Sequence, residues 1–253
     1  MADGPYRLLT RADFDGIVSA RLLRDAGVVD RVEFAHPRDV EAGRIPVDAG
    51  TVLATLPYRS EAAMFFHHRH DPCIVGPVET GAMSSVSTAR AIFDHYGAGA
   101  FAGTSDELID AVDRCTAGHL GKADICEPAG WVMLNFIMDA RTGLGRFTDF
   151  AVSNTQLMLD MIGHLGEPDP DRVLAQPDVR ERVVLYGDHA RAFADQLKRC
   201  TAVSGRIGII DLRYEDFIFC GNRFLVYALV PEIDVSIHVY WGQERRNTVI
   251  AAG

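Results

Sequence analysis

Short apolar runs alternate with helix-like patterns through the first half of the chain. Brief runs rich in β-branched and aromatic residues predict buried strands, whereas apolar residues that recur every three or four positions predict helices. The runs of strand type are residues 6–10, 32–36, 51–56 and 63–66. The helical patterns are residues 17–26, 85–96 and 108–112. Such alternation predicts an α/β fold in which helices cover both faces of a mostly parallel sheet.

The pattern changes after Phe147. Two helical patterns follow, at residues 154–165 and 179–200, and the second is either one long helix or two helices joined near Gly187. Strand patterns then dominate at residues 207–212, 223–229, 235–241 and 248–251, and the last three suggest a meander. We therefore predict two domains. An N-terminal parallel-sheet domain covers residues 1–165, a linker and connecting helix cover 166–204, and a smaller C-terminal α/β domain covers 205–253.

The composition narrows the classes of function. The chain is 48% hydrophobic and 24% charged, which is typical of a globular protein. A formal net charge of −10 argues against binding of long nucleic acid, which needs a basic surface. A small phosphorylated anion, held locally by arginines, stays compatible with this charge. No apolar stretch is long enough to span a membrane, and the five cysteines lack C-x-x-C spacing. We expect a cytoplasmic protein without membrane contact and leave a homo-oligomer open.

Two polar motifs end predicted strands. Asp13 and Asp15 follow the first strand and precede a helix, and His67 and His68 follow another strand about fifty residues later. Carboxylates and imidazoles at strand ends suit a divalent metal ion that acts on a phosphoester. Each motif also has a structural interpretation, because aspartates in turns cap helices and paired histidines often bind neighbouring carbonyl groups. Spacing alone does not choose between these interpretations.

A third polar segment combines glycines with arginines. Gly143 and Gly145 alternate with polar residues after an apolar stretch, and Arg141 and Arg146 lie on either side of them. Glycines allow close approach of the backbone to a ligand, and guanidinium groups match phosphate or carboxylate geometry. The alternative is a glycine turn with solvated arginines.

These segments together resemble one family. Residues 8–16, Leu-Leu-Thr-Arg-Ala-Asp-Phe-Asp-Gly, resemble motif I of the DHH phosphoesterases, in particular the exopolyphosphatase-like bacterial subgroup. Residues 56–58 and 65–68 fall where motifs II and III belong, and residues 130–147 are the closest match. The region from Gly205 is similar to the start of the second domain of the family, DHHA1. The resemblance covers nearly the whole chain and implies an N-terminal DHH-like domain followed by part of a DHHA1-like domain.

The resemblance implies roles for individual residues. Family members hold two manganese or magnesium ions that activate water. By position, Asp13, Asp15, His67 and His68 match ligand or phosphate-contact positions of the family. We expect Asp13, Asp15 and His67 to be metal ligands and His68 to be catalytic through proton transfer. The chemistry of the guanidinium group suggests phosphate contacts for Arg141 and Arg146. Other positions depart from the family pattern. Arg11 stands where many relatives have histidine, and neutral residues occupy three positions where the family has polar or acidic residues; these degenerate positions are Thr55, Phe66 and Thr116.

The departures separate two main hypotheses. Two neighbouring cations need several carboxylates to offset their repulsion, so the substitutions favour a pseudoenzyme that keeps an anion-binding cleft and binds one weak metal ion or none. The alternative is an active manganese- or magnesium-dependent phosphoesterase that acts on polyphosphate, a short oligonucleotide or a small phosphodiester, with Asp139 or Asp113 as a substitute carboxylate. A purely structural role is a third hypothesis. Replacing Phe66 and Thr116 together by aspartate is expected to raise the affinity for manganese.

Overall fold

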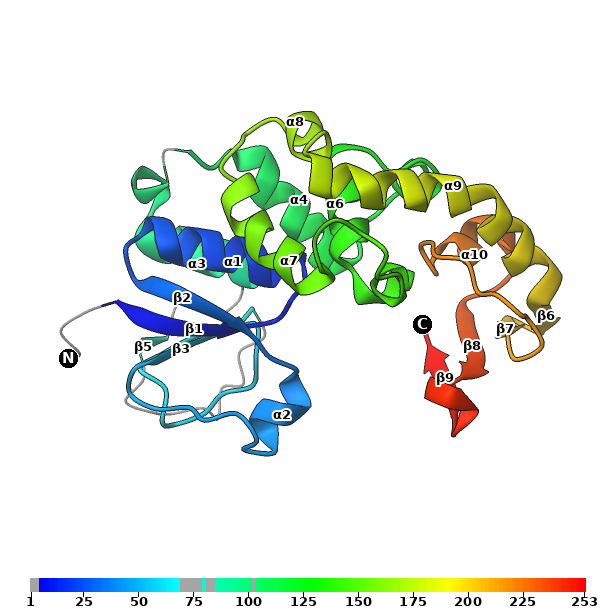
Figure 1. The fold of residues 1–253 in the computed structure, drawn as a ribbon, viewed down its shortest axis with the longest axis horizontal. Coiled ribbons are helices and arrows are strands. Elements are labelled where there is room, and N and C mark those ends of the chain that lie inside the picture. Colours follow the sequence, from blue (N-terminus) through cyan, green and yellow to red (C-terminus); the bar gives the residue numbers. More distant parts are fainter. Residues whose placement is uncertain (1–4, 69–78, 81–84, 102) are drawn as a thin grey trace.

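A five-stranded sheet organises the N-terminal part of the molecule (Figure 1). The computed structural model describes residues 5–68, 79–80, 85–101 and 103–253. The strand order is β2-β1-β3-β4-β5, and every neighbouring pair is parallel. The carboxyl ends of the strands therefore share one edge of the sheet. The strands are β1 (Tyr6–Thr10), β2 (Val29–Phe34), β3 (Thr51–Ala54), β4 (Met64–Phe66) and β5 (Glu79–Thr80).

Alternation along the strands divides the apolar side chains between two cores. Leu8 and Phe66 belong to the larger core, whereas their neighbours Leu9 and Phe65 belong to a smaller core on the other face. Most helices pack on the first face, and α2 lies against the second (Figure 1). The predicted α/β fold is confirmed. The helices of this part are α1 (Phe14–Asp25), α2 (Pro37–Glu41), α3 (Thr88–Tyr96), α4 (Asp106–Ala117), α5 (Lys122–Cys126), α6 (Gly130–Met138) and α7 (Asn154–His164).

A single long helix connects the two parts of the molecule. After α8 (Pro170–Leu174), α9 (Pro177–Cys200) continues without a break through the position of Gly187. Tyr186 of α9 belongs to the larger core, and Leu197 belongs to a third core in the C-terminal part. Because α9 contributes to both cores, the domain boundaries at residues 165 and 204 stay predictions. Within the described ranges, no helix has both the length and the apolar character that a membrane span requires.

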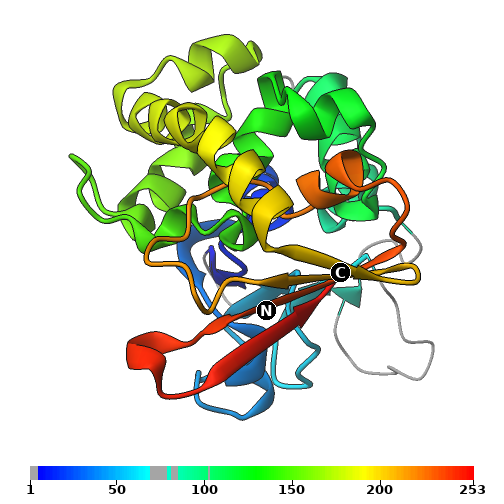
Figure 2. The ribbon, with the colours of Figure 1, turned by 90° about the vertical axis from the view of Figure 1, so that its right-hand side faces the viewer.

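The second sheet has four strands and lies beneath α9 (Figure 2). Its order is β6-β7-β8-β9, with β7 and β8 parallel and the outer pairs antiparallel. The strands are β6 (Thr201–Ser204), β7 (Ile207–Asp211), β8 (Val235–Trp241) and β9 (Thr248–Ala252). The short 3-10 helices of the chain are η1 (Ala98–Ala100), η2 (Ala140–Thr142), η3 (Leu144–Arg146) and η4 (Gln243–Arg245).

The predicted strand over residues 223–229 is wrong, and so is the meander built on it. This segment contains helix α10 (Leu225–Leu229), which forms part of the crossover between the parallel strands β7 and β8. A short continuous apolar run does not distinguish a buried strand from a buried helix. Asn222 decides the local structure, because its side-chain oxygen accepts a hydrogen bond from the Phe224 N–H at 3.0 Å. Val226 then packs into the third core.

The position of Phe66 in the larger core makes its contribution to stability measurable. Its side chain is 1% exposed, and its ring lies 5.7 Å from the ring of His95. Phe66→Ala is expected to lower the free energy of unfolding by about 3–5 kcal/mol, because it leaves a cavity. Urea unfolding measures this, with Phe217→Ala as the control because Phe217 is 48% exposed. Equal losses in the two variants would contradict the assignment of Phe66 to the core.

Candidate functional site

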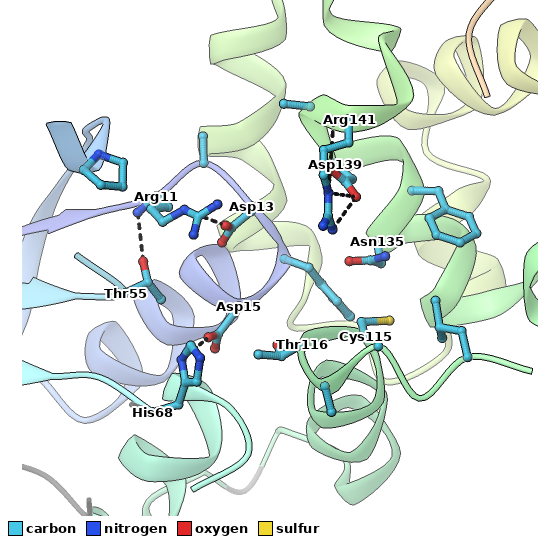
Figure 3. Close-up of a pocket in the computed structure, with 18 of the residues that line it drawn as sticks. Arg11, Asp13, Asp15, Thr55, His68, Cys115, Thr116, Asn135, Asp139 and Arg141 are labelled. Carbon is cyan, nitrogen blue, oxygen red and sulfur yellow. Dashed lines mark hydrogen bonds and ion pairs between the residues drawn. The ribbon is translucent and has the colours of Figure 1, made fainter. Parts of the chain in front are cut away.

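A cleft of about 1080 Å³ opens at the carboxyl ends of strands β1 to β4. One wall consists of the residues that follow these strands. The opposite wall comes from the end of α4, from α6 and from η2, and it includes two aromatic side chains of the C-terminal part, Phe224 and Tyr227. Figure 3 shows Asp13, Asp15 and His68 on the strand side, facing Asn135 and Arg141 across the cleft.

The cleft gathers most of the residues that the sequence predicted. Two predicted residues, Phe66 and Arg146, do not line it. The residues that do line it are Arg11, Asp13, Asp15, Thr55, His67, His68, Thr116 and Arg141.

The turn after β1 depends on Asp13 and Gly16. Asp13 caps α1, since its carboxylate accepts a hydrogen bond from the Gly16 N–H at 3.0 Å. The same carboxylate pairs with the guanidinium of Arg11 at 2.9 Å. A Cβ atom on Gly16 would lie 2.1 Å from the Arg11 carbonyl oxygen, so only glycine fits. The structural interpretation of this motif is therefore correct, and it still leaves the Asp13 side chain 30% exposed in the cleft.

Asp15 belongs to the first turn of α1, and its side chain is buried against the beginning of α3. Its carboxylate accepts hydrogen bonds from the Thr88 N–H at 3.0 Å and the Ala89 N–H at 2.8 Å. Burial, followed by the charge of Asp13, raises the pKa of Asp15 to about 6. The two backbone donors oppose this change because they stabilise the charged form, but burial outweighs them.

The paired histidines extend from β4 towards Asp15. Nδ1 of His68 lies 3.8 Å from Oδ2 of Asp15 and 3.3 Å from Oγ1 of Thr88. The rings of His67 and His68 stack with their centroids 4.8 Å apart. His68 therefore lines the cleft beside Asp15, with its Nδ1 within hydrogen-bond distance of Thr88 but not of Asp15.

Thr55 has an unusual backbone conformation beside these residues. Its φ angle is 60°, in the left-handed region that β-branched residues rarely adopt. The hydroxyl oxygen lies 3.1 Å from Oγ1 of Thr10 and accepts a hydrogen bond from the Arg11 N–H at 3.1 Å. Such a conformation costs about 1–3 kcal/mol and occurs mostly at functional sites. Thr55 thus joins the ends of β1 and β3 where they form the cleft.

Phe66 does not point into the cleft, a question that the sequence left open. Its ring packs in the larger core against His95 and Tyr96. An aspartate at this position would bury a charge in an apolar core instead of adding a metal ligand. The double replacement of Phe66 and Thr116 is therefore expected to destabilise the fold and not to raise the affinity for manganese.

The arrangement of donors does not fit a preassembled metal centre. Among the described residues, no three histidine, cysteine, aspartate or glutamate side chains converge closely enough to hold an ion. Asp13 is engaged by Arg11 and by the helix cap, and Asp15 is engaged by the backbone of α3. The assignment of Asp13, Asp15 and His67 as ligands of manganese or magnesium stays a prediction.

Arg141 reaches the cleft from the opposite wall. Asp139 accepts hydrogen bonds from its Nε and lies 2.7 Å from its Nη2. These bonds raise the pKa of Arg141. Asp139 is thereby committed to orienting Arg141, and it does not supply a spare carboxylate. Asp113 lies outside the cleft, paired with Ser87 at 2.6 Å and Arg90 at 2.8 Å.

Arg146 has a structural position, contrary to the phosphate contact expected for it. Its Nη2 donates to the carbonyl oxygens of Ile218 at 2.9 Å and Phe219 at 3.4 Å. Burial lowers the pKa of Arg146. The side chain connects η3 to the segment before α10, which explains why it does not reach the cleft.

Several cleft residues were not predicted as site residues from the sequence. Phe224 and Tyr227 lie in the segment predicted as a strand, His36 had no motif around it, and Asn135 lies within the family-like segment 130–147 without a role assigned to it. His36 caps α2, since its Nδ1 accepts a hydrogen bond from the Arg38 N–H at 3.2 Å. Nothing in the spacing of these residues indicated a site. Phe224 and Tyr227 reach the cleft because the segment before α10 contacts η2, where the Gly221 N–H donates to the Thr142 carbonyl oxygen at 3.0 Å.

The titration of Asp15 should make the stability of the metal-free protein fall between about pH 4 and pH 6. The pKa of the folded state is about 6, above the ordinary value of 3.8, so the folded state binds more protons than the unfolded state in this range. The contribution of Asp15 to stability is therefore fully present below about pH 4 and is lost as the pH rises through 6. The difference between the two pKa values corresponds to on the order of 3 kcal/mol.

Urea unfolding of the wild type and Asp15→Asn, from pH 4 to 7, checks this prediction. The difference in unfolding free energy between the two proteins should change with pH by this amount. Asp30→Asn, at an exposed position of β2 outside the cleft, should instead follow the wild type. A pH-independent difference between the wild type and Asp15→Asn would show that Asp15 has an ordinary pKa.

Comparison with known proteins assigns the chain to a family. No protein-family profile matches the sequence, and no curated protein matches it. A solved structure described as the pGpG-specific phosphodiesterase PggH from Vibrio cholerae is 38% identical, with a TM-score of 0.85 over 98% of this chain and 82% of that chain. An uncharacterized protein from Helicobacter pylori G27 aligns over 98% of this chain and 85% of that chain, but at 9% identity and a TM-score of 0.33. The similarity to the first structure, together with the motifs around the cleft, shows that the chain belongs to the DHH/DHHA1 family of phosphoesterases.

Proposed function

We propose that this protein is an active phosphodiesterase that hydrolyses a short 5′-phosphorylated dinucleotide such as pGpG. The observation that carries the proposal is one cleft that gathers Asp13, Asp15, His68 and Arg141 in a chain similar over 98% of its length to a pGpG-specific phosphodiesterase. Phe66 packs in the core and does not obstruct the cleft, which leaves room for a ligand. The absence of the family aspartate at this position still counts in favour of the second candidate function.

The size of the cleft agrees with such a substrate. A volume of about 1080 Å³ lies just above the usual range for small-molecule sites, as a dinucleotide requires. Arg11 and Arg141 are each 51% exposed and lie on opposite walls. Each guanidinium pairs with an aspartate, Asp13 or Asp139, so the two arginines offer hydrogen-bond donors to a phosphate and not a net positive charge. The net charge of −10 disfavours long nucleic acid.

The residues of the chain have distinct roles in the proposed reaction. Arg141, oriented by Asp139, binds the phosphodiester and stabilises the charge that develops on its oxygens. His68 is the group proposed to hold or transfer a proton near the scissile bond, and its Nδ1 lies 3.3 Å from Oγ1 of Thr88.

We propose a divalent ion as a bound cofactor and assign no reaction step to it. DHH phosphoesterases typically depend on divalent metal ions, and Asp13, Asp15 and His67 are the proposed ligands for manganese or magnesium. In this structure Asp13 pairs with Arg11, and Asp15 accepts hydrogen bonds from the backbone of α3. A bound ion would have to replace these partners. The steps assigned above to His68 and Arg141 do not depend on that exchange.

The second candidate function is binding of the dinucleotide without hydrolysis. Thr55 and Thr116 are neutral and line the cleft. Two threonines offer weaker ligands than carboxylates for a pair of cations. This observation favours a pseudoenzyme that retains its anion-binding cleft.

Hydrolysis of pGpG distinguishes the two functions. With manganese, the wild type should convert pGpG to GMP, which chromatography measures. Asp13→Ala should lower the rate by about 100-fold or more. Even the loss of a residue that only contacts a metal ligand lowers activity by about 10- to 100-fold. Asp30→Ala is the matched control, because this aspartate is exposed and outside the cleft. Binding of pGpG without formation of GMP in the wild type would favour the pseudoenzyme.

The two arginines at positions 141 and 146 should behave differently. Arg141→Ala removes a charged hydrogen-bond donor from the cleft, so the KM for pGpG should rise by about 10- to 100-fold, which corresponds to about 1.5–3 kcal/mol. Arg146→Ala should lower the urea midpoint and leave KM unchanged, because Arg146 binds backbone carbonyls outside the cleft. Steady-state kinetics and urea unfolding measure both effects. A larger change of KM in Arg146→Ala would contradict the assignment.

A further inference from the structure

Each of the strands β1 to β4 is followed by a polar side chain that lines the cleft. Arg11 follows β1, Thr55 follows β3 and His67 follows β4. After β2 the corresponding side chain is that of His36, which also lines the cleft and has no role in the proposed reaction. Ligands of parallel sheets bind at the carboxyl ends of the strands, so His36 occupies a position from which a ligand can be reached.

Backbone pairing between the first two strands continues one residue beyond them and places His36. The Ala35 N–H donates to the Thr10 carbonyl oxygen at 2.9 Å. His36 therefore lies at the edge of the sheet, next to the turn that begins with Arg11. Both residues are exposed, and both line the cleft.

The hydrogen bond that caps α2 fixes the tautomer of His36. Nδ1 accepts from the Arg38 N–H at 3.2 Å, so the proton of the neutral ring lies on Nε2. Pro37, at the first helical position, keeps His36 extended with a φ of −85° and a ψ of 136°. Among the described residues, none forms a hydrogen bond with Nε2. The Nε2–H is therefore a donor available to a ligand.

The capping of α2 does not by itself require a histidine. Short side chains such as serine, aspartate and asparagine are the preferred caps of helices. The side-chain caps of α1, α3, α4, α7 and α8 in this protein are all serine or aspartate. An imidazole adds to the cap a second nitrogen, which a short side chain lacks.

The position of β2 assigns this donor to a part of the ligand away from the reacting bond. In the order β2-β1-β3-β4, three strand spacings of about 4.8 Å separate the ends of β2 and β4 by roughly 14 Å. His68, the proposed proton-transfer residue, follows β4. Of the groups that a 5′-phosphorylated dinucleotide carries away from its linkage, the terminal phosphate is the anionic one. It suits an N–H donor beside the guanidinium of Arg11.

We propose that His36 is a substrate-binding residue whose Nε2–H donates a hydrogen bond to the terminal 5′-phosphate of the dinucleotide. This inference rests on the proposed function, and it gives the cleft a means to distinguish dinucleotides with and without a 5′-phosphate. Arg11 pairs with Asp13 at 2.9 Å, so its charge is partly neutralised. His36 adds a donor there that no carboxylate occupies.

The binding of two dinucleotides tests this role without a need for hydrolysis. The probes are pGpG and GpG with a phosphorothioate linkage, which slows hydrolysis, and calorimetric titration with manganese present measures Kd. The wild type should bind the pGpG analogue more tightly than the GpG analogue. His36→Asn should raise the Kd of the pGpG analogue by about 10- to 100-fold and leave that of the GpG analogue unchanged, because a hydrogen bond to a charged group is lost.

Two further variants separate binding from folding. Asparagine is itself a preferred cap, so His36→Asn should keep the urea midpoint of the wild type. His36→Ala removes both the cap and the donor, so it should lower the urea midpoint as well as the affinity for the pGpG analogue. His119→Asn is the matched control at an exposed histidine that does not line the cleft, and its Kd values should match those of the wild type.

The outcomes distinguish this role from the proposed function. An unchanged Kd of the pGpG analogue in His36→Asn, an equal rise for both analogues, or no binding by the wild type would overturn the role of His36. Binding of the 5′-phosphate that needs His36, without formation of GMP from pGpG and manganese, would support this role while the proposed hydrolysis fails. Formation of GMP with the same KM in the wild type and His36→Asn would support the proposed function and overturn the role of His36.

Discussion

The buried carboxylate of Asp15 joins the elements that form the cleft. It belongs to the first turn of α1, accepts hydrogen bonds from the first turn of α3 and lies beside His68 after β4. The beginning of a helix stabilises negative charge, which partly offsets the cost of burying this group. These bonds add to the packing of α1 and α3 in the larger core, where Ile17 and Ile92 meet. Thr88, whose N–H binds Asp15, also lies 3.3 Å from the ring of His68, so the carboxylate and the histidine share one neighbour.

This arrangement places structural and chemical requirements on the same side chains. Asp13 caps α1 while it faces the cleft, and Thr55 adopts a left-handed conformation to bond the ends of β1. A site that maximised stability would avoid both a buried acid with a raised pKa and a strained threonine. Their combination at the carboxyl edge of a parallel sheet is typical of a position kept for function.

The parts of the site that lie within one strand and its following turn were predictable from the sequence. The apolar run before Asp13, the glycine at position 16 and the helical pattern after it predict a strand-to-helix turn, because all these signals are local. Positions set by long-range packing were not predictable. Phe66 occupies a ligand position in the motif, yet strand alternation turns its ring into the core. Arg146 follows a glycine-rich turn, yet backbone carbonyls more than seventy residues away bind it.

The side of the cleft formed by α10 shows most clearly that positions set by long-range packing cannot be predicted from a local pattern. An apolar run such as residues 224–230 fits a strand and a helix equally well, so its local pattern says nothing about which rings face a ligand. The choice depends on Asn222, on Val226 in the third core and on α9, which carries residues of both the larger and the third core. The position of α10 relative to the strands depends on α9 together with two direct connections, from Arg146 to the carbonyl oxygens of Ile218 and Phe219 and from the Gly221 N–H to the Thr142 carbonyl oxygen. The width of the cleft is therefore set by contacts between residues more than seventy positions apart, which no local sequence pattern reveals.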